Sequence, residues 1–239
     1  MQKRNINTCH VVLNTIYYRV GVKRLSERQS ERMTIDKDDL LNSIMESLDR
    51  VQHIALEDIP NIDLYMDQVT TFMESKLKST VRNADTDKIL TKTMINNYAK
   101  NDLLPPPVKK KYSKEHVLML IFIYYYKNIL SINDIQTLLG PISEKYFQAR
   151  EGLNLGDIYE EIFSLEKTQV DNLKKDILEK FETTRSTFMD APKEEQEFLQ
   201  LFSFIGLLSF DVYIKKLLIE KMVDTFGNAA SNENGKDKK

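Results

Sequence analysis

The sequence contains little cysteine, glycine or proline, and it contains no tryptophan. Its 239 residues include one cysteine, 7 glycines and 6 prolines. A single cysteine excludes both a disulfide framework and a cysteine zinc site within one chain. A reducing compartment suits such a chain, so we expect a cytoplasmic protein. Because so few glycines and prolines leave little material for tight turns, the sequence predicts an all-α fold.

Long hydrophobic runs and catalytic motifs are also missing from the sequence. The most apolar stretch, 198–214, contains Gln200 and Asp211 and is too short and too interrupted to span a bilayer. No phosphate-binding glycine loop, nucleophile elbow or metal-spaced histidine and glutamate motif occurs. His53 and His116 are isolated in the sequence. We therefore expect no membrane contact, no catalytic residue, no cofactor and no metal, and we do not expect an enzyme.

Charge is distributed very unevenly along the chain, although the formal net charge is only −2. Residues 88–116 carry seven lysines against two acidic side chains, and residues 1–32 carry seven basic against two acidic side chains. Residues 151–226 carry nine basic against sixteen acidic side chains. A polyanion responds to the local basic patch and not to the total charge. The lysine-rich segment 88–116 is therefore the candidate contact for an anionic partner.

The first 32 residues differ from the rest of the chain. They are basic and contain a short apolar cluster, as a weak targeting peptide does, but no small-residue cleavage site follows. The alternative is an upstream extension preceding a true start at Met33. Under either interpretation we assign no function to residues 1–32.

Hydrophobic periodicity divides the remaining chain into helices and loops. Three proline residues at 105–107 cannot continue a helix, and Gly140-Pro141 is expected to end one. We expect helices at 36–53, 64–77, 90–100, 114–130, 132–139, 157–185 and 193–226, a loop at 79–87, a short extended wing at 108–112 and a linker at 142–156. The domains are predicted as an N-terminal helix at 36–58, a winged helix-turn-helix at 59–140, a dimerisation or effector region at 141–227 and a disordered tail at 228–239.

The segment 94–106 resembles the recognition helix and wing of the MerR family. It reads MINNYAKNDLLPP, where that family has Thr-Ile-Arg-x-Tyr-Glu followed by Gly-Leu-Leu-Pro-Pro. Residues 112–117 and 121–139 are similar to the two helices that follow in the family. From Ile59 onward the chain also resembles the bacterial domain-of-unknown-function family 1836, which is linked to MerR-like folds. The resemblance implies a winged helix-turn-helix transcriptional regulator that binds double-stranded DNA.

Several polar side chains in this segment are of types that bind nucleic acid. Asparagine can pair with adenine through two hydrogen bonds, and lysine neutralises phosphates. Threonines and free amides at a helix start suit phosphate as well. The candidate DNA-binding residues are Lys88, Thr91, Lys92, Thr93, Asn96, Asn97, Lys100, Lys109, Lys110 and Lys111.

The sequence also departs from the MerR pattern. Asn96 stands at the recognition arginine, and Asp102 replaces a glycine, although aspartate tolerates a left-handed conformation less well. No arginine lies within 88–116. The alternative function is therefore a protein-interaction module on a winged-helix frame that no longer binds DNA.

The two long C-terminal helices carry more apolar surface than one monomer needs. The resemblance implies a homodimer through this region, with two DNA half-sites about one turn apart. It also implies a small-molecule effector. A hydrophobic pocket for it among Phe198, Phe202, Phe204 and Phe210 is one interpretation, and core packing is the other.

Overall fold

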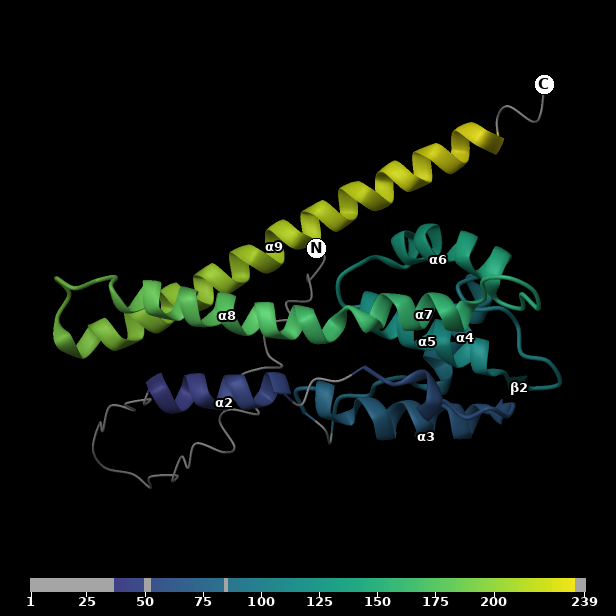
Figure 1. The fold of residues 1–239 in the computed structure, drawn as a ribbon, viewed down its shortest axis with the longest axis horizontal. Helices are drawn as coiled ribbons and strands as arrows, with labels where there is room; N and C mark the ends of the chain where they lie inside the picture. The colour runs from purple at the N-terminus through teal and green to yellow at the C-terminus, as the bar shows by residue number, and fades with distance from the viewer. Residues whose placement is uncertain (1–36, 50–52, 84–85, 235–239) are drawn as a thin grey trace.

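The computed structural model describes residues 37–49, 53–83 and 86–234, and these residues are mostly helical, which confirms the predicted all-α class (Figure 1). The predicted extension at 1–32 and the last five residues, 235–239, lie outside the described residues. None of the described helices is long and apolar enough to cross a membrane. The elements are α2 (Lys37–Asp49), η1 (Leu56–Asp58), β1 (Leu64–Tyr65), α3 (Met66–Leu77), η2 (Lys78–Thr80), α4 (Lys92–Lys100), β2 (Lys111–Tyr112), α5 (Lys114–Tyr126), α6 (Ile132–Tyr146), α7 (Leu155–Ser164), α8 (Glu166–Arg185) and α9 (Lys193–Asn234).

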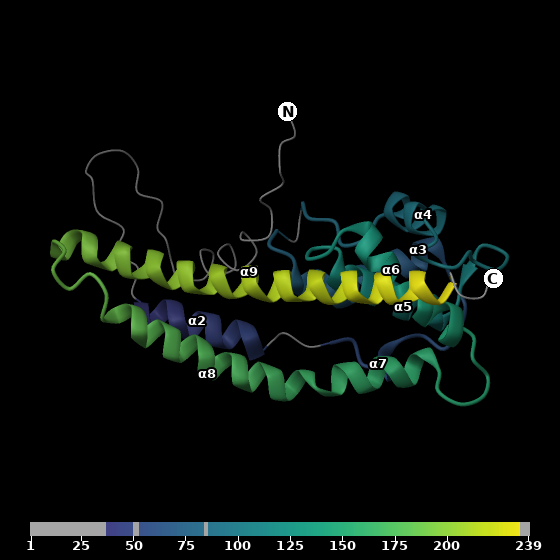
Figure 2. The ribbon, with the colours of Figure 1, turned by 90° about the horizontal axis from the view of Figure 1, so that it is seen from above.

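The molecule consists of a head and an arm. The head contains α3 to α7 with the two short strands, and the arm contains α2, α8 and the first half of α9. Helix α9 runs from the far end of the arm to the head, where it packs on α6 (Figures 1 and 2). The head and arm have separate hydrophobic cores, and α9 contributes side chains to both.

The core of the head is built around α5. Its residues from His116 to Tyr124 are all buried, because other helices cover it on every side. An apolar run of this kind is expected for a central helix and not for an amphipathic surface helix. Helices α6 and α7 and strand β2 contact this central helix.

Helix α7 belongs to the head. The hydroxyl of Tyr159 donates a 2.5 Å hydrogen bond to the backbone carbonyl of Ile54, and its ring packs against Phe122 and Phe163. The helix predicted over 157–185 is in fact two helices, because α7 ends and α8 begins on either side of the exposed Leu165. The head core therefore extends well beyond the predicted domain boundary at 140.

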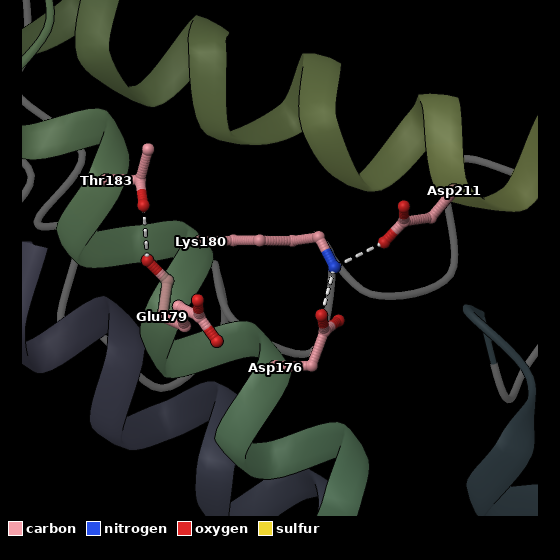
Figure 3. Close-up of polar contacts among 5 residues, drawn as sticks. All are labelled: Asp176, Glu179, Lys180, Thr183 and Asp211. Carbon is pink, nitrogen blue, oxygen red and sulfur yellow. Dashed lines mark hydrogen bonds and ion pairs between the residues drawn. The ribbon is translucent and has the colours of Figure 1, made fainter.

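The arm is held by a smaller apolar core and by ion pairs. Phe181 of α8 and Phe204 of α9 pack edge to face at 5.3 Å between ring centroids. Lys180 lies between the carboxylates of Asp176 and Asp211, with 2.6 Å from its Nζ to Asp211 (Figure 3). Hydrogen bonds to Asp176, which has the larger effect, and to Asp211 raise the pKa of Lys180. Lys180 therefore links α8 to α9 at the surface of the arm.

Other predicted boundaries were wrong as well. Helix α6 continues through Gly140 and Pro141 to Tyr146, which shortens the predicted linker. Pro141 is exposed and costs one backbone hydrogen bond, while Leu138 and Ile142 on either side pack against the core. The predicted helix at 64–77 begins with a strand at 64–65, because Leu64 and Tyr65 pair with β2. Helix α9 extends to Asn234 into the predicted disordered tail, where two alanines favour helix.

Candidate nucleic-acid interface

Helix α4 presents one polar face to solvent. The Thr91 hydroxyl caps it by accepting a 3.1 Å hydrogen bond from the Met94 amide, and Ile95 and Tyr98 point into the core. Figure 2 shows α4 at the outer edge of the head, on the side away from α7. The exposed residues of this helix include Lys92, Thr93, Asn96, Asn97 and Lys100. Five of the predicted DNA-binding residues therefore share a solvent-facing helix, whereas the Thr91 side chain serves as its cap.

Helix α4 is followed by a residue in the left-handed conformation. Asp102 has a φ of 55°, and the amide of Leu103 donates a 2.9 Å hydrogen bond to the carbonyl of Tyr98. This six-to-one bond is typical of a Schellman motif, in which glycine is preferred. Leu103 and Leu104 are buried directly after it. Asp102 thus adopts the conformation that glycine usually has at the end of a helix, and the chain leaves α4 toward the wing.

The wing is a two-residue hairpin with lysines at its tip. Val108 and Lys111 exchange backbone hydrogen bonds of 3.1 and 2.9 Å. Lys109 and Lys110 between them have φ values of 51° and 65°, and both side chains are exposed. Such a turn favours asparagine and glycine, and other residues adopt it at an energetic cost. The hairpin therefore presents two lysine side chains to solvent on a backbone that is unfavourable for lysine.

The base of the wing is fixed to the start of α3. Strand β2 pairs antiparallel with β1, with Lys111 opposite Tyr65 and Tyr112 opposite Leu64. The Nζ atom of Lys111 lies 5.3 Å from the centre of the Tyr65 ring, and Lys111 is half-buried. Lys111 is therefore more constrained than the two lysines at the tip. Strand β2 lies at the end of the molecule opposite the arm (Figure 1).

One acidic side chain on this surface was missed by the sequence analysis. Asp67, in the first turn of α3, forms an ion pair with Lys92 of α4, and both side chains are exposed. Asp67 and Lys92 are distant in sequence, and no local pattern predicted their contact. The ion pair joins the start of α4 to the first turn of α3, and the carboxylate competes with any anionic ligand of Lys92.

Two side chains at the C-terminal end of α5 contact the segment that precedes α4. Lys127, directly after α5, donates a 2.6 Å hydrogen bond to the carbonyl of Ile89 and lies 4.8 Å from the centre of the Tyr124 ring. Tyr124 and Thr80 share a 2.5 Å hydrogen bond, and Thr80 in turn donates to the carbonyl of Leu77. Burial lowers the pKa of Lys127 and raises that of Tyr124. Both ends of the connection between α3 and α4, which includes the exposed Lys88, are thus anchored to the central helix.

The start of α5 is built around a buried histidine. The amide of Ser113 donates a 2.9 Å hydrogen bond to Nδ1 of His116, so the histidine supplies the acceptor that an acidic residue usually provides there. The imidazole is only 1% exposed and packs edge to face between Tyr112 and Phe147. Because Nδ1 accepts a hydrogen bond, His116 contributes to this cap as a neutral imidazole.

We expect acid to weaken the fold at His116. Burial lowers its pKa below the ordinary 6.5, against the opposing effect of the carbonyls of Pro106 and Pro105 and the carboxylates of Glu115 and Asp63. The unfolded state then binds the proton more readily, so this contribution to stability is complete above pH 6.5 and is lost as the pH falls through the folded-state pKa. Denaturant unfolding at pH 7.5 and at lower pH measures it.

A matched variant isolates this histidine from the carboxylates that also titrate. Because a glutamine oxygen can accept the same hydrogen bond but does not titrate, His116→Gln should show a smaller loss of stability than the native chain between pH 7 and pH 5. An equal loss in both proteins would show that His116 does not carry the pH dependence.

The pocket considered among four phenylalanines of α9 is absent. Phe204 is buried against α8, whereas Phe198, Phe202 and Phe210 are exposed and do not face it. Among the residues that the structure describes, no group of three or more histidine, cysteine, aspartate or glutamate side chains gathers as a metal site would.

Comparison with protein families gives a match that lies within the head. Residues 54–162 match the family model described as domain of unknown function DUF1836. The match supports the family resemblance inferred from Ile59 onward. No curated protein and no solved structure matches the chain. The DUF1836 segment begins at the buried Ile54 and ends within α7, so it coincides with the head, and α8 and α9 lie beyond it.

Proposed function

We propose that the protein is a DNA-binding transcriptional regulator whose head acts as a MerR-like winged helix-turn-helix. The order of strand, α3, α4, wing and α5 agrees with that architecture. The observation that carries the proposal is the wing, where Lys109 and Lys110 accept left-handed backbone conformations at an exposed tip. Next to it, α4 offers an exposed face of amides and lysines that fits a major groove.

The chemistry of the two elements suggests a division of roles. Asn96 and Asn97 lie on the exposed face of α4, where each amide can read adenine through N6 and N7. Lys109 and Lys110 neutralise backbone phosphates, and each contact adds about 0.9 to the slope of log K against log salt. The wing would therefore supply affinity, and the asparagines would supply sequence preference.

Retardation of random-sequence duplex DNA at low salt tests the proposal. The native full-length chain is expected to retard the duplex, and the triple variant Lys109→Glu, Lys110→Glu, Lys111→Glu is expected to abolish retardation. Circular dichroism confirms that the variant retains its helices. A native chain that leaves the duplex unretarded would contradict the proposal.

We expect Asp67→Asn to strengthen DNA binding several-fold. The change releases Lys92 from its ion pair and removes a negative charge from the surface. The salt slope should rise by about 0.9 if Lys92 gains a phosphate. Stability should change by less than about 1 kcal/mol, because the ion pair is exposed. Fluorescence anisotropy with labelled duplex over a salt series measures both quantities.

A charge-matched control accompanies Asp67→Asn. Glu197→Gln removes the same charge from an exposed position in the arm. An equal gain in affinity from both variants would mean that only net charge matters and that Lys92 makes no contact with DNA.

The ion pair between Asp67 and Lys92 also favours a second candidate function, a protein-interaction module that no longer binds DNA. In such a module Lys92 needs no phosphate, and the exposed face of α4 binds a partner protein instead. This candidate predicts that the native chain leaves duplex DNA unretarded at low salt, so the same experiment separates the two functions.

We propose further that a second copy of the chain packs against α9 of the arm. Four aromatic side chains of this helix are between 60% and 69% exposed, namely Phe198, Phe202, Phe210 and Tyr213. The nearby Gly206 has open space beside it, so another helix can approach closely. With the partly exposed aliphatic residues, this face offers roughly 600 Å² of apolar surface per protomer, close to the 800 Å² of a standard interface.

A homodimer of this kind would give the protein two heads. Two linked heads can bind two half-sites, and effective concentration raises the affinity of the pair above that of one head by about 100-fold or more.

A further inference from the structure

The head contains a cavity that none of the roles above uses. It has a volume of about 420 Å³ and lies between α5, α6, α7 and the C-terminal part of α9. Its walls are almost entirely apolar. The lining residues are Phe122, Tyr126, Thr137, Leu138, Leu139, Pro141, Ile142, Ile158, Ile162 and Phe226.

The cavity depends on the docking of α9 against α6. Phe226 of α9 lines it, and the adjacent Gly227 approaches α6 so closely that an added Cβ would lie 3.3 Å from the Thr137 methyl group. Ile162 of α7 and Phe226 are both partly exposed, which is expected for residues at the mouth of a cavity. A bound molecule would therefore touch the head and the long C-terminal helix at once.

The lining offers polar groups in only two side chains. These are Tyr126 and Thr137, and no hydrogen bond from either hydroxyl to another described residue is found. Burial raises the pKa of Tyr126, so its hydroxyl remains a neutral donor. No charged side chain lines the cavity, and an ion there would lose its hydration without gaining a partner.

We propose that this cavity binds an uncharged, mainly apolar small molecule that carries one hydrogen-bonding group. Small-molecule sites commonly have volumes of about 300–1,000 Å³, and an apolar cavity of roughly 150 Å³ already binds benzene. The volume and the apolar lining with two hydroxyl groups therefore favour a small molecule.

The uncharged fluorophore N-phenyl-1-naphthylamine tests the cavity in the full-length protein. We expect its emission to rise on binding and to saturate at one site per chain. The substitution Ile162→Trp puts a larger side chain at the mouth and should weaken binding at least tenfold, and Phe226→Ala, which removes part of the wall, should weaken it as well. The test does not depend on DNA binding.

The matched control is Ile132→Trp, also in the head. Ile132 and Ile162 are 49% and 46% exposed, but Ile132 does not line the cavity. The control should bind the fluorophore as the native chain does. An absence of enhanced emission, a signal that does not saturate, or equal effects of the two tryptophan variants would overturn the proposal.

Discussion

Replacement of the wing tip by Lys109→Asn with Lys110→Gly is expected to weaken duplex binding by about 10- to 100-fold at 0.1 M salt, because two phosphate contacts are lost. Both residues adopt the left-handed conformation, with φ values of 51° and 65°. Asparagine and glycine are the residues that such a turn prefers, so the hairpin itself should become more stable. The change therefore removes charge while preserving the shape of the wing.

This variant is informative because it should lower the affinity for DNA while it raises the stability of the hairpin. A lysine-to-glutamate variant loses the attraction to DNA phosphates and adds repulsion from them, whereas this variant only loses the attraction. We expect the slope of log K against log salt to fall by about 1.8, while the melting temperature stays constant or rises. Anisotropy titrations over a salt series and thermal unfolding measure the two effects.

The control removes two positive charges from the arm. Lys175→Gln with Lys215→Gln changes two exposed helix residues to one that favours helix almost equally. DNA binding should be nearly unchanged in this protein. If the arm variant loses as much affinity as the wing variant, the wing has no special role.

The local elements of the head could be predicted from the sequence because each has a local cause. Thr91 caps α4, and the spacing of Ile95 and Tyr98 sets its buried face, so its exposed face followed from helical periodicity. The proline residues at 105–107 separated α4 from the wing. These patterns lie within a few residues of the feature that they determine.

Contacts between distant segments could not be predicted in the same way. The ion pair of Asp67 with Lys92 and the hydrogen bond from Lys127 to Ile89 depend on how α3, α4 and α5 pack. The continuation of α6 past Pro141 also depends on packing, because tertiary contacts offset the lost hydrogen bond.

The pocket that was one interpretation of the phenylalanines in α9 is absent for a reason that was visible in the sequence. Phe198 and Phe202 are four residues apart and share a helix face, whereas Phe204 lies two residues farther, about 200° around the axis. Phe204 therefore faces α8, while the other two face solvent. The same geometry that excludes a pocket creates the exposed aromatic face.

Disruption of that face is expected to separate the proposed dimer. Phe202→Asp places a charge at the centre of the apolar surface, and a symmetric dimer contains the change twice. If each copy costs roughly 2 kcal/mol, as at an interface hot spot, the dimer dissociation constant rises about 1,000-fold. Phe202 is 62% exposed, so the monomer should remain folded. Sedimentation equilibrium is expected to show the mass of one chain for the variant and of two chains for the native protein.

The control for this experiment lies on the same helix. Leu218→Asp introduces the same charge at a residue that is 55% exposed but lies on another side of α9. It should leave the dimer intact, and Phe202→Asp should also weaken binding to a duplex long enough for two heads. A native chain that sediments as a monomer, or equal effects of the two aspartate variants, would contradict pairing through this face. A dimer that persists in Phe202→Asp would place the contact elsewhere in the chain.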